Sequence, residues 1–256
     1  MSHWQLLLLF STGFIGGAVN AVAGGGTFII YPVLLSLGIP PVAANATCTP
    51  TVFFGQITSA VGYHNYVRTL PKRYLLLLFP FVAGALVGAS LLVKTTDRQF
   101  EVVVPWFIAF ATLLILFQPR LHKWLYSKRA RTLEHKHKVI FSLFITISIF
   151  LLALYGGYFG AGYGIVMLAL LGLSKLTNIH QMNGLKILGG IAITTVAGLY
   201  FIHEGIIAWQ VIPALAMGNA IGGWLGATYS TKLPTKVIRG IIISIGVVLA
   251  LVLFIR

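Results

Sequence analysis

The chain reads Gly24-Gly25-Gly26-Thr27-Phe28-Ile29-Ile30-Tyr31-Pro32 directly after its first long apolar stretch. A second glycine cluster, Gly160-Ala161-Gly162-Tyr163-Gly164, follows another apolar stretch in the second half. Each cluster precedes an apolar segment, 27–38 or 163–175, that as a helix rises only about 18–20 Å at 1.5 Å per residue. Crossing the hydrocarbon core takes about 30 Å, so both short segments are predicted to be broken or re-entrant helices.

The composition around these clusters is that of a membrane protein. Of 256 residues, 58% are hydrophobic and 9% are charged, whereas a soluble domain carries about 25% charged residues. Apolar blocks close to membrane length run from one terminus to the other, which excludes a soluble enzyme and a protein held by one anchor. We therefore predict an all-α polytopic membrane protein in contact with the lipid bilayer.

The charged residues are strongly unbalanced in sign. Lys and Arg number 18 against 4 Asp and Glu, which gives a formal net charge of +14. The positive residues lie between the apolar blocks, a pattern typical of topology signals, so we expect no nucleic-acid partner. The single cysteine, Cys48, excludes an intrachain disulfide and a cysteine-based metal cluster. We expect no metal, no cofactor and no enzymatic activity.

The apolar blocks, separated by Gly, Pro and charged residues, predict ten helical segments. An offset of 138 residues relates the two halves, because it places Gly24 on Gly162 and Asn45 on Asn183. The sequence therefore predicts two repeats of five segments each. The ten segments are 4–23, 27–38, 42–63, 73–93, 99–117, 139–159, 163–175, 180–202, 208–230 and 237–255.

The chain then divides into a first transmembrane repeat at 1–118, a basic cytoplasmic linker at 119–138 and a second repeat at 139–256. If each short segment crosses or returns, the gaps on one side hold 15 of the 18 Lys and Arg. The positive-inside rule assigns that side to the cytoplasm. The repeats then have inverted topology in a cell (inner) membrane, with both termini on the non-cytoplasmic side. Inverted repeats with broken helices are the architecture of secondary transporters.

The glycine clusters are predicted to approach each other near the membrane midplane and to form the binding site. Glycine permits a positive φ in a turn, and the free N–H groups at the starts of the short helices attract anions. All four acidic residues lie in loops or at segment ends, which favours an anionic over a cationic substrate. The predicted substrate-binding residues are Asn20, Gly24, Gly25, Gly26, Thr27, Asn45, Thr47, Gly160, Gly162, Tyr163, Gly164, Asn183 and Lys186.

Two interpretations of the polar residues stay open. Lys186 either contacts the anion or extends toward the cytoplasmic surface, because a lysine at a helix centre costs roughly 2.5–3.5 kcal/mol on insertion scales. The asparagines either donate to a cavity or only form hydrogen bonds between helices. Further polar side chains inside predicted segments are those of Thr49, Gln56 and Asn219. Glycines at small-xxx-small spacing are Gly13, Gly17, Gly84, Gly88, Gly156, Gly160, Gly164, Gly218, Gly222 and Gly226, and those outside the two clusters are predicted to serve helix packing.

These residues resemble a known family. The first glycine stretch, continued by Leu34-Leu35, Gly38, Pro40, Ala44 and Thr47, is similar to the first-half motif of the TauE/SafE sulfite-exporter family. The second half is similar to it through Gly157, Gly160, Gly162, Gly164 and the run Gly222-Gly223-Trp224-Leu225-Gly226-Ala227. The resemblance covers nearly the whole chain, but the family's glycine before the triplet is replaced around Asn20 to Ala23.

The resemblance implies a duplicated helical permease for sulfur-containing anions such as sulfite, sulfonates and thiosulfate. The family is commonly assigned eight spans, which agrees with ten segments if the two short ones are partial. We therefore expect a permease that moves a small anion by alternating access between two repeats. A channel-like anion pore and a non-transporting membrane scaffold subunit are the alternatives, and a homodimer is compatible with the sequence.

Overall fold

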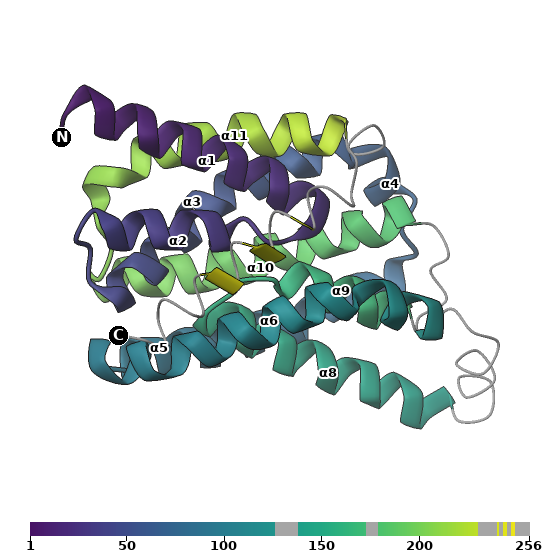
Figure 1. Cartoon of the computed structure of the whole chain (residues 1–256). Coiled ribbons are helices and arrows are strands. Elements are labelled where there is room, and N and C mark those ends of the chain that lie inside the picture. Colours follow the sequence, from purple (N-terminus) through teal and green to yellow (C-terminus); the bar gives the residue numbers. More distant parts are fainter. Residues whose placement is uncertain (126–137, 173–178, 230–239, 241–242, 245–246, 249–256) are drawn as a thin grey trace.

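The computed structural model describes residues 1–125, 138–172 and 179–229, together with residues 240, 243–244 and 247–248. Within these residues every regular element is a helix (Figure 1). The described elements are α1 (His3–Ala23), α2 (Thr27–Ser36), α3 (Pro41–Gly62), α4 (His64–Arg68), the 3-10 helix η1 (Lys72–Leu77), α5 (Leu78–Val93), α6 (Asp97–Leu125), α8 (Lys138–Tyr158), α9 (Tyr163–Gly172), α10 (Ile179–His203), the 3-10 helix η2 (Trp209–Val211) and α11 (Ile212–Thr228).

The fold is that of an all-α polytopic membrane protein. Four stretches of the described helices are long and apolar enough to cross a membrane: His3–Val22, Tyr74–Val93, His180–His203 and Trp209–Thr228. Large apolar side chains point away from the bundle, and Phe79 is 80% exposed. Such exposure is unfavourable in water and favourable against lipid tails. The outer surface of the bundle therefore suits a hydrocarbon surrounding.

The two short helices that the glycine clusters predict are present. Helices α2 and α9 have ten residues each, a rise of about 15 Å. Helix α2 ends at Ser36, earlier than the predicted residue 38, because Gly38 has a φ of +79° that no helix continues. Helix α2 thus stops well before it could span the hydrocarbon core, whereas the residues that follow Gly172 of α9 lie outside the described part of the chain.

Other boundaries differ from the prediction. Helix α6 continues to Leu125 although Pro119 and Arg120 predicted an end near residue 117. A proline removes only one hydrogen bond, which neighbouring turns of a long apolar helix can tolerate in a membrane. The first basic gap is also partly helical, because α4 and η1 lie there. The predicted segment 237–255 falls almost entirely outside the described residues.

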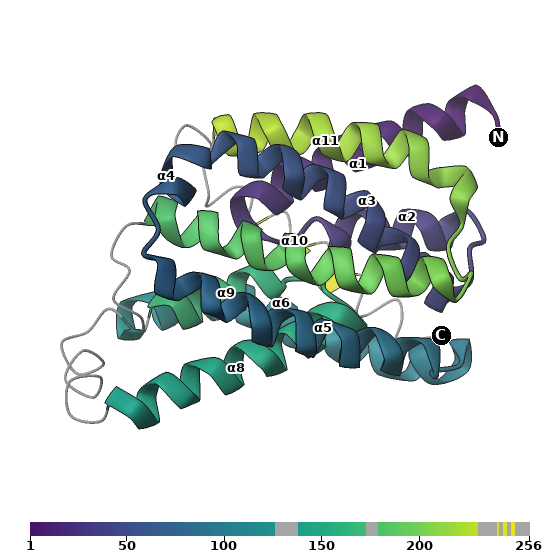
Figure 2. The same ribbon diagram turned by 180° about the vertical axis from the view of Figure 1, so that it is seen from behind.

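The packing exchanges helices between the two halves of the sequence. Helix α11 packs against α1 and α3, whereas α5 packs against α8 and α10 (Figures 1 and 2). Glycines permit both contacts, as their spacing predicted: a Cβ atom on Gly222 would overlap the Phe14 carbonyl oxygen, and one on Gly88 the Leu154 carbonyl oxygen. Helix α5 of the first sequence half therefore packs mainly against helices of the second half, and α11 of the second half packs mainly against helices of the first.

The inverted relation of the two repeats stays a prediction, and the two glycine turns bear on it. The turn between α1 and α2 comprises residues 24–26 and contains one left-handed glycine, Gly24. The turn between α8 and α9 comprises residues 159–162 and contains two, Gly160 and Gly162, of which the offset pairs Gly162 with Gly24. The second turn is therefore one residue longer than the first.

Candidate functional site

The two glycine turns meet inside the bundle, as the sequence predicted. Gly24, Gly160 and Gly162 have φ values of +81°, +74° and +77°, which favour glycine over any other residue. A Cβ atom on Gly24 would lie 2.7 Å from the Gly164 Cα atom, and one on Gly164 would lie 2.9 Å from the Gly24 Cα atom. The backbones of the two turns are thus in direct contact, and no side chain separates them.

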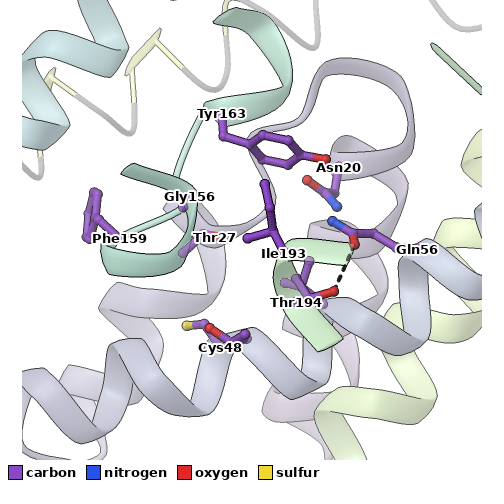
Figure 3. Close-up of a pocket in the computed structure, with 12 residues that line it drawn as sticks. Asn20, Thr27, Cys48, Gln56, Gly156, Phe159, Tyr163, Ile193 and Thr194 are labelled. Atoms are coloured by element: carbon purple, nitrogen blue, oxygen red, sulfur yellow. Dashed lines mark hydrogen bonds between the residues drawn. The ribbon is translucent and has the colours of Figure 1, made fainter. Parts of the chain in front are cut away.

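A cavity with a volume of about 30 Å³ lies beside this contact (Figure 3). The starts of both short helices reach it through Thr27 and Tyr163. No side chain caps the first N-terminal turn of α2, which leaves that turn with the partial positive charge of a helix start. The residues that line this cavity are Asn20, Thr27, Cys48, Thr49, Val52, Gln56, Gly156, Phe159, Gly160, Tyr163, Ile193 and Thr194.

A smaller cavity of about 10 Å³ adjoins the first, because both are lined by Asn20, Gln56 and Tyr163. Its other lining residues are Ala21, Gly24, Ser59, Lys186 and Ile187. A water molecule needs about 10–15 Å³ of such volume. The larger cavity therefore has room for at least about two water molecules, and the smaller one for about one.

Lys186 is the charged group of the site. Its side chain is 2% exposed, and its Nζ atom donates to the Ala21 carbonyl oxygen at 3.0 Å. The aliphatic part of the side chain passes over Gly164, where a Cβ atom would lie 3.1 Å from Lys186 Cδ. The side chain thus points into the protein and does not extend to the surface.

The Lys186 ammonium lacks a counter-charge in the described part of the chain. An ammonium group has three N–H donors, and the described residues offer its side chain one acceptor, the Ala21 carbonyl oxygen. A buried charge is costly unless it is paired. Lys186 also lines the smaller cavity, where a bound anion would supply the missing partner.

Two side-chain amides add further donors. The Gln56 Oε1 atom accepts a hydrogen bond from Thr194 Oγ1 at 3.1 Å, which turns the Gln56 Nε2 atom toward Asn20 (Figure 3). Within the described residues neither that Nε2 atom nor the Asn20 amide has a hydrogen-bond partner. The residues that line the two cavities include no carboxylate. The site therefore offers N–H donors and a positive charge, the requirements of an anion site.

Space for these groups depends on a glycine in α10. A Cβ atom on Gly190 would lie 2.6 Å from Gln56 Nε2 and would overlap the Tyr163 hydroxyl. That hydroxyl donates to the Lys186 carbonyl oxygen at 2.6 Å. Gly190 thus allows the start of α9 to be fixed to α10 directly beside Lys186.

The predicted site residues fall into three groups in the structure. Six line the cavities: Asn20, Gly24, Thr27, Gly160, Tyr163 and Lys186. Four belong to the turns without lining a cavity: Gly25, Gly26, Gly162 and Gly164. Three lie elsewhere among the helices: Asn45, Thr47 and Asn183.

The third group takes part in contacts between elements. The Asn45 Nδ2 atom donates to the Tyr158 carbonyl oxygen at 2.8 Å and so connects α3 to the end of α8. Thr47 Oγ1 accepts from the Ala208 N–H at 3.0 Å and connects α3 to the loop before η2. Asn183 is buried with an unpaired Oδ1 atom. For Asn45 and Thr47, the structure thus agrees with the alternative of interhelical hydrogen bonding.

Several lining residues were not among the predicted site residues, notably Cys48, Val52, Phe159, Ile193 and Thr194. The repeat offset holds a signal for one of them. Gln56 and Thr194, which share a hydrogen bond, are separated by 138 residues. Applying the offset to Gln56, already noted as a polar side chain in an apolar segment, leads directly to Thr194.

Comparisons with known proteins agree with this architecture. The profile of a family described as "Sulfite exporter TauE/SafE" matches residues 9–253. A probable membrane transporter protein of Haemophilus influenzae is 27% identical over 247 residues, which cover 93% of this chain and 90% of that protein. The probable membrane transporter protein ORF9 of Sinorhizobium sp is 25% identical over 253 residues, with coverages of 96% and 91%. The probable membrane transporter protein YfcA of Escherichia coli is 25% identical over 259 residues, with coverages of 98% and 90%. No solved structure matches the chain.

Proposed function

The chain belongs to the sulfite exporter TauE/SafE family, and from this we propose that it is a permease for a small sulfur-containing anion such as sulfite, a sulfonate or thiosulfate. Its curated relatives are named as probable membrane transporters, so it is a multi-pass membrane protein of a transporter family. Beyond membership of a transporter family, the proposal specifies that the substrate is a small anion and where in the protein it binds.

The observation that carries the proposal is the environment of Lys186. The ammonium is buried beside a cavity, its one described partner is a carbonyl oxygen, and the residues that line both cavities include no carboxylate. A protein that retains such a group gives up stability in the empty state. A bound anion recovers that cost through charge-assisted hydrogen bonds with Lys186, Asn20 and Gln56.

The mechanism that we propose is that of a carrier that works by alternating access. Because α11 packs on α1 and α3, and α5 packs on α8 and α10, the two moving bodies would each contain helices from both sequence halves. Rocking between them would open the contact of the two glycine turns alternately to either side.

The orientation in the membrane forms part of the proposal. Placing the positive gaps in the cytoplasm of a cell (inner) membrane leaves both termini outside and relates the repeats by inversion. The Gln56–Thr194 hydrogen bond supports this, because residues related by the repeat offset meet at a two-fold axis if the repeats are inverted. A cysteine at position 205 in a Cys48→Ala background should react with an impermeant maleimide from outside only; reaction from the cytoplasm alone would overturn the inversion.

Counterflow in proteoliposomes tests the proposal. Proteoliposomes that contain the purified protein and are loaded with unlabelled sulfite should accumulate labelled sulfite. Lys186→Met should lower the rate of this exchange by about 10- to 100-fold, the effect of losing a charged hydrogen bond. Lys94→Met, which removes an exposed lysine at the end of α5, is the matched control and should transport normally. Flux without saturation would indicate a pore, and no flux with any sulfur-containing anion would indicate a scaffold; either result, or full activity of Lys186→Met, would overturn the proposal.

A further inference from the structure

Tyr163 lines both cavities beside Lys186, but the hydrogen of its hydroxyl is already engaged. The hydroxyl donates to the Lys186 backbone carbonyl oxygen at 2.6 Å, and a phenolic hydroxyl has one hydrogen to donate. Toward the cavity it offers only lone pairs, which an anion does not bind. We propose that Tyr163 is a positioning residue and not an anion ligand: it sets the anion affinity of the site by holding Lys186 in place. This inference rests on the proposed function and names the residue that places its charged group.

The hydrogen bond joins the second glycine turn to the backbone of the lysine. Tyr163 is the first residue of α9 and directly follows Gly162, whose φ of +77° favours glycine. Its side chain is 6% exposed, and the bond length lies at the short end of the range for O–H···O hydrogen bonds. The turn that fixes the start of α9 therefore also fixes α10 at residue 186.

Gly164 gives a second contact with the same lysine. A Cβ atom on Gly164 would lie 3.1 Å from Lys186 Cδ and 3.6 Å from Lys186 Cγ, so the aliphatic part of the lysine passes directly over this backbone. Two successive residues of α9 thus hold Lys186, one at its carbonyl oxygen and the other beneath its side chain. The Nζ atom is then directed to the Ala21 carbonyl oxygen near the end of α1.

Gly190, one turn after Lys186 on α10, leaves room for this hydrogen bond. A Cβ atom on Gly190 would overlap the Tyr163 hydroxyl, and small residues are what let groups of one membrane helix approach the backbone of another. The Tyr163 ring reaches across the cavity with its hydroxyl toward the Asn20 side chain (Figure 3). The hydroxyl is therefore held among the polar groups of the site without a hydrogen left for the anion.

An ordered lysine binds an anion more tightly than a mobile one. The lysine side chain is a flexible four-carbon chain, and ordering such a chain at the moment of binding costs affinity. A lysine that is held before the anion arrives avoids part of that cost. Loss of the Tyr163 hydroxyl should therefore weaken anion binding by about 3- to 10-fold, the equivalent of one neutral hydrogen bond.

The concentration dependence of sulfite counterflow tests this inference. Tyr163→Phe keeps the ring and removes the hydroxyl. It should raise the half-saturating sulfite concentration about 3- to 10-fold and change the maximal rate less than about twofold, because the hydroxyl acts on affinity alone. An unchanged half-saturating concentration, or a loss confined to the maximal rate, would overturn the inference.

Tyr155→Phe is the matched control. The Tyr155 hydroxyl donates to the Ala161 carbonyl oxygen, also at 2.6 Å, within the second glycine turn. Removing it deletes a hydrogen bond of the same kind and length that does not involve Lys186, so the half-saturating sulfite concentration should stay at the wild-type value. A rise equal to that of Tyr163→Phe would show that general loosening of the turn, and not the placement of Lys186, sets the affinity.

A double variant separates action through the lysine from direct contact with the anion. At low sulfite concentration, Tyr163→Phe should slow exchange about 3- to 10-fold in the wild-type background but less than about twofold in the Lys186→Met background, where the lysine that it positions is absent. Equal losses in both backgrounds would show that Tyr163 contacts the anion itself, which would contradict the positioning role.

The outcomes distinguish this inference from the proposed function. Full activity of Lys186→Met overturns the proposed function, whereas a strong effect of Lys186→Met with none of Tyr163→Phe overturns the present inference alone. A second measurement needs no transport: the sulfite concentration that gives half of the maximal rise in melting temperature in detergent. Tyr163→Phe should raise this concentration and Tyr155→Phe should not; the same concentration for both variants would overturn the inference.

Discussion

The turns after α1 and α8 both bring a backbone into the centre of the bundle, but they depend on their glycines to different degrees. Gly24 combines a φ of +81° with a position where a Cβ atom would lie 2.7 Å from the Gly164 Cα atom of the opposite turn. Gly160 has a φ of +74°, and the nearest atom to its Cβ position is the Gly156 carbonyl oxygen of its own segment, at 2.9 Å. The first turn is constrained by its partner as well as by its own backbone, and the second mainly by its backbone.

Helices α3 and α10, which pack beside the turns, also differ from each other. Helix α10 contributes a buried lysine and α3, at the corresponding position, a buried cysteine. Where two repeats descend from one pattern, one half can keep the geometry while the other acquires the chemistry. The close contact of the turns and the buried Lys186 beside them are the reason why we propose one anion position there.

The largest expected effect comes from substitutions at the two left-handed glycines. Gly24→Ala should cost about 2–5 kcal/mol of stability, the sum of the left-handed strain and of overpacking against Gly164. Gly160→Ala should cost only about 1–2 kcal/mol, mainly from the backbone. Thermal unfolding of the purified variants in detergent measures the difference. A loss at Gly160 equal to or larger than that at Gly24 would show that the turns are constrained alike.

Much of the fold was predictable because membrane helices require long apolar blocks, which are easily recognised in the sequence. Block length and the first glycine cluster identified α2 as a short helix, and both clusters marked the turns that precede α2 and α9, since a φ such as that of Gly24 favours glycine. The exchange of α5 and α11 between the halves was not predictable. A row of small residues such as Gly218 and Gly222 indicates a helix face that packs closely against another helix. It does not predict which helix that is.

An intermediate effect is expected at the two corresponding positions on α3 and α10, with opposite signs. Lys186→Met removes a buried charge that has no described counter-charge, so the ligand-free protein should gain about 1–3 kcal/mol of stability. Cys48→Ala removes a small buried group and should lose up to about 1 kcal/mol. Melting temperatures without and with methanesulfonate test both. The wild-type protein should gain stability from the ligand and Lys186→Met should not; a destabilised, ligand-responsive Lys186→Met would contradict the comparison.

The candidate site was predictable only at residues whose polar side chains are energetically unfavourable inside a membrane helix. Lys186 was identified because a lysine inside an apolar segment is energetically costly in a membrane. Asn20 was identified because it lies shortly before a glycine turn. Val52 and Ile193 carry no such signal, since most residues of a membrane helix look the same whether they face a cavity, lipid or another helix. Asn45 and Asn183 did carry the signal, yet neither lines a cavity, because buried amides serve helix contacts equally well.

The smallest expected effect concerns the hydrogen bond that joins the two halves at Gln56 and Thr194. Thr194→Val leaves the buried Gln56 Oε1 atom without its described donor and should cost about 1–2 kcal/mol. Gln56→Leu should cost less, about 0.5 kcal/mol, because Thr194 Oγ1 still donates to the Gly190 carbonyl oxygen at 2.8 Å. A double-mutant cycle on melting temperature isolates the pair. Ser59→Ala, which removes a hydroxyl hydrogen-bonded to the Gly55 and Gly223 carbonyl oxygens, is the control and should add independently to either change. Equal losses for the two single variants, or no coupling between them, would show that this hydrogen bond contributes no measurable stability to the contact between the two halves.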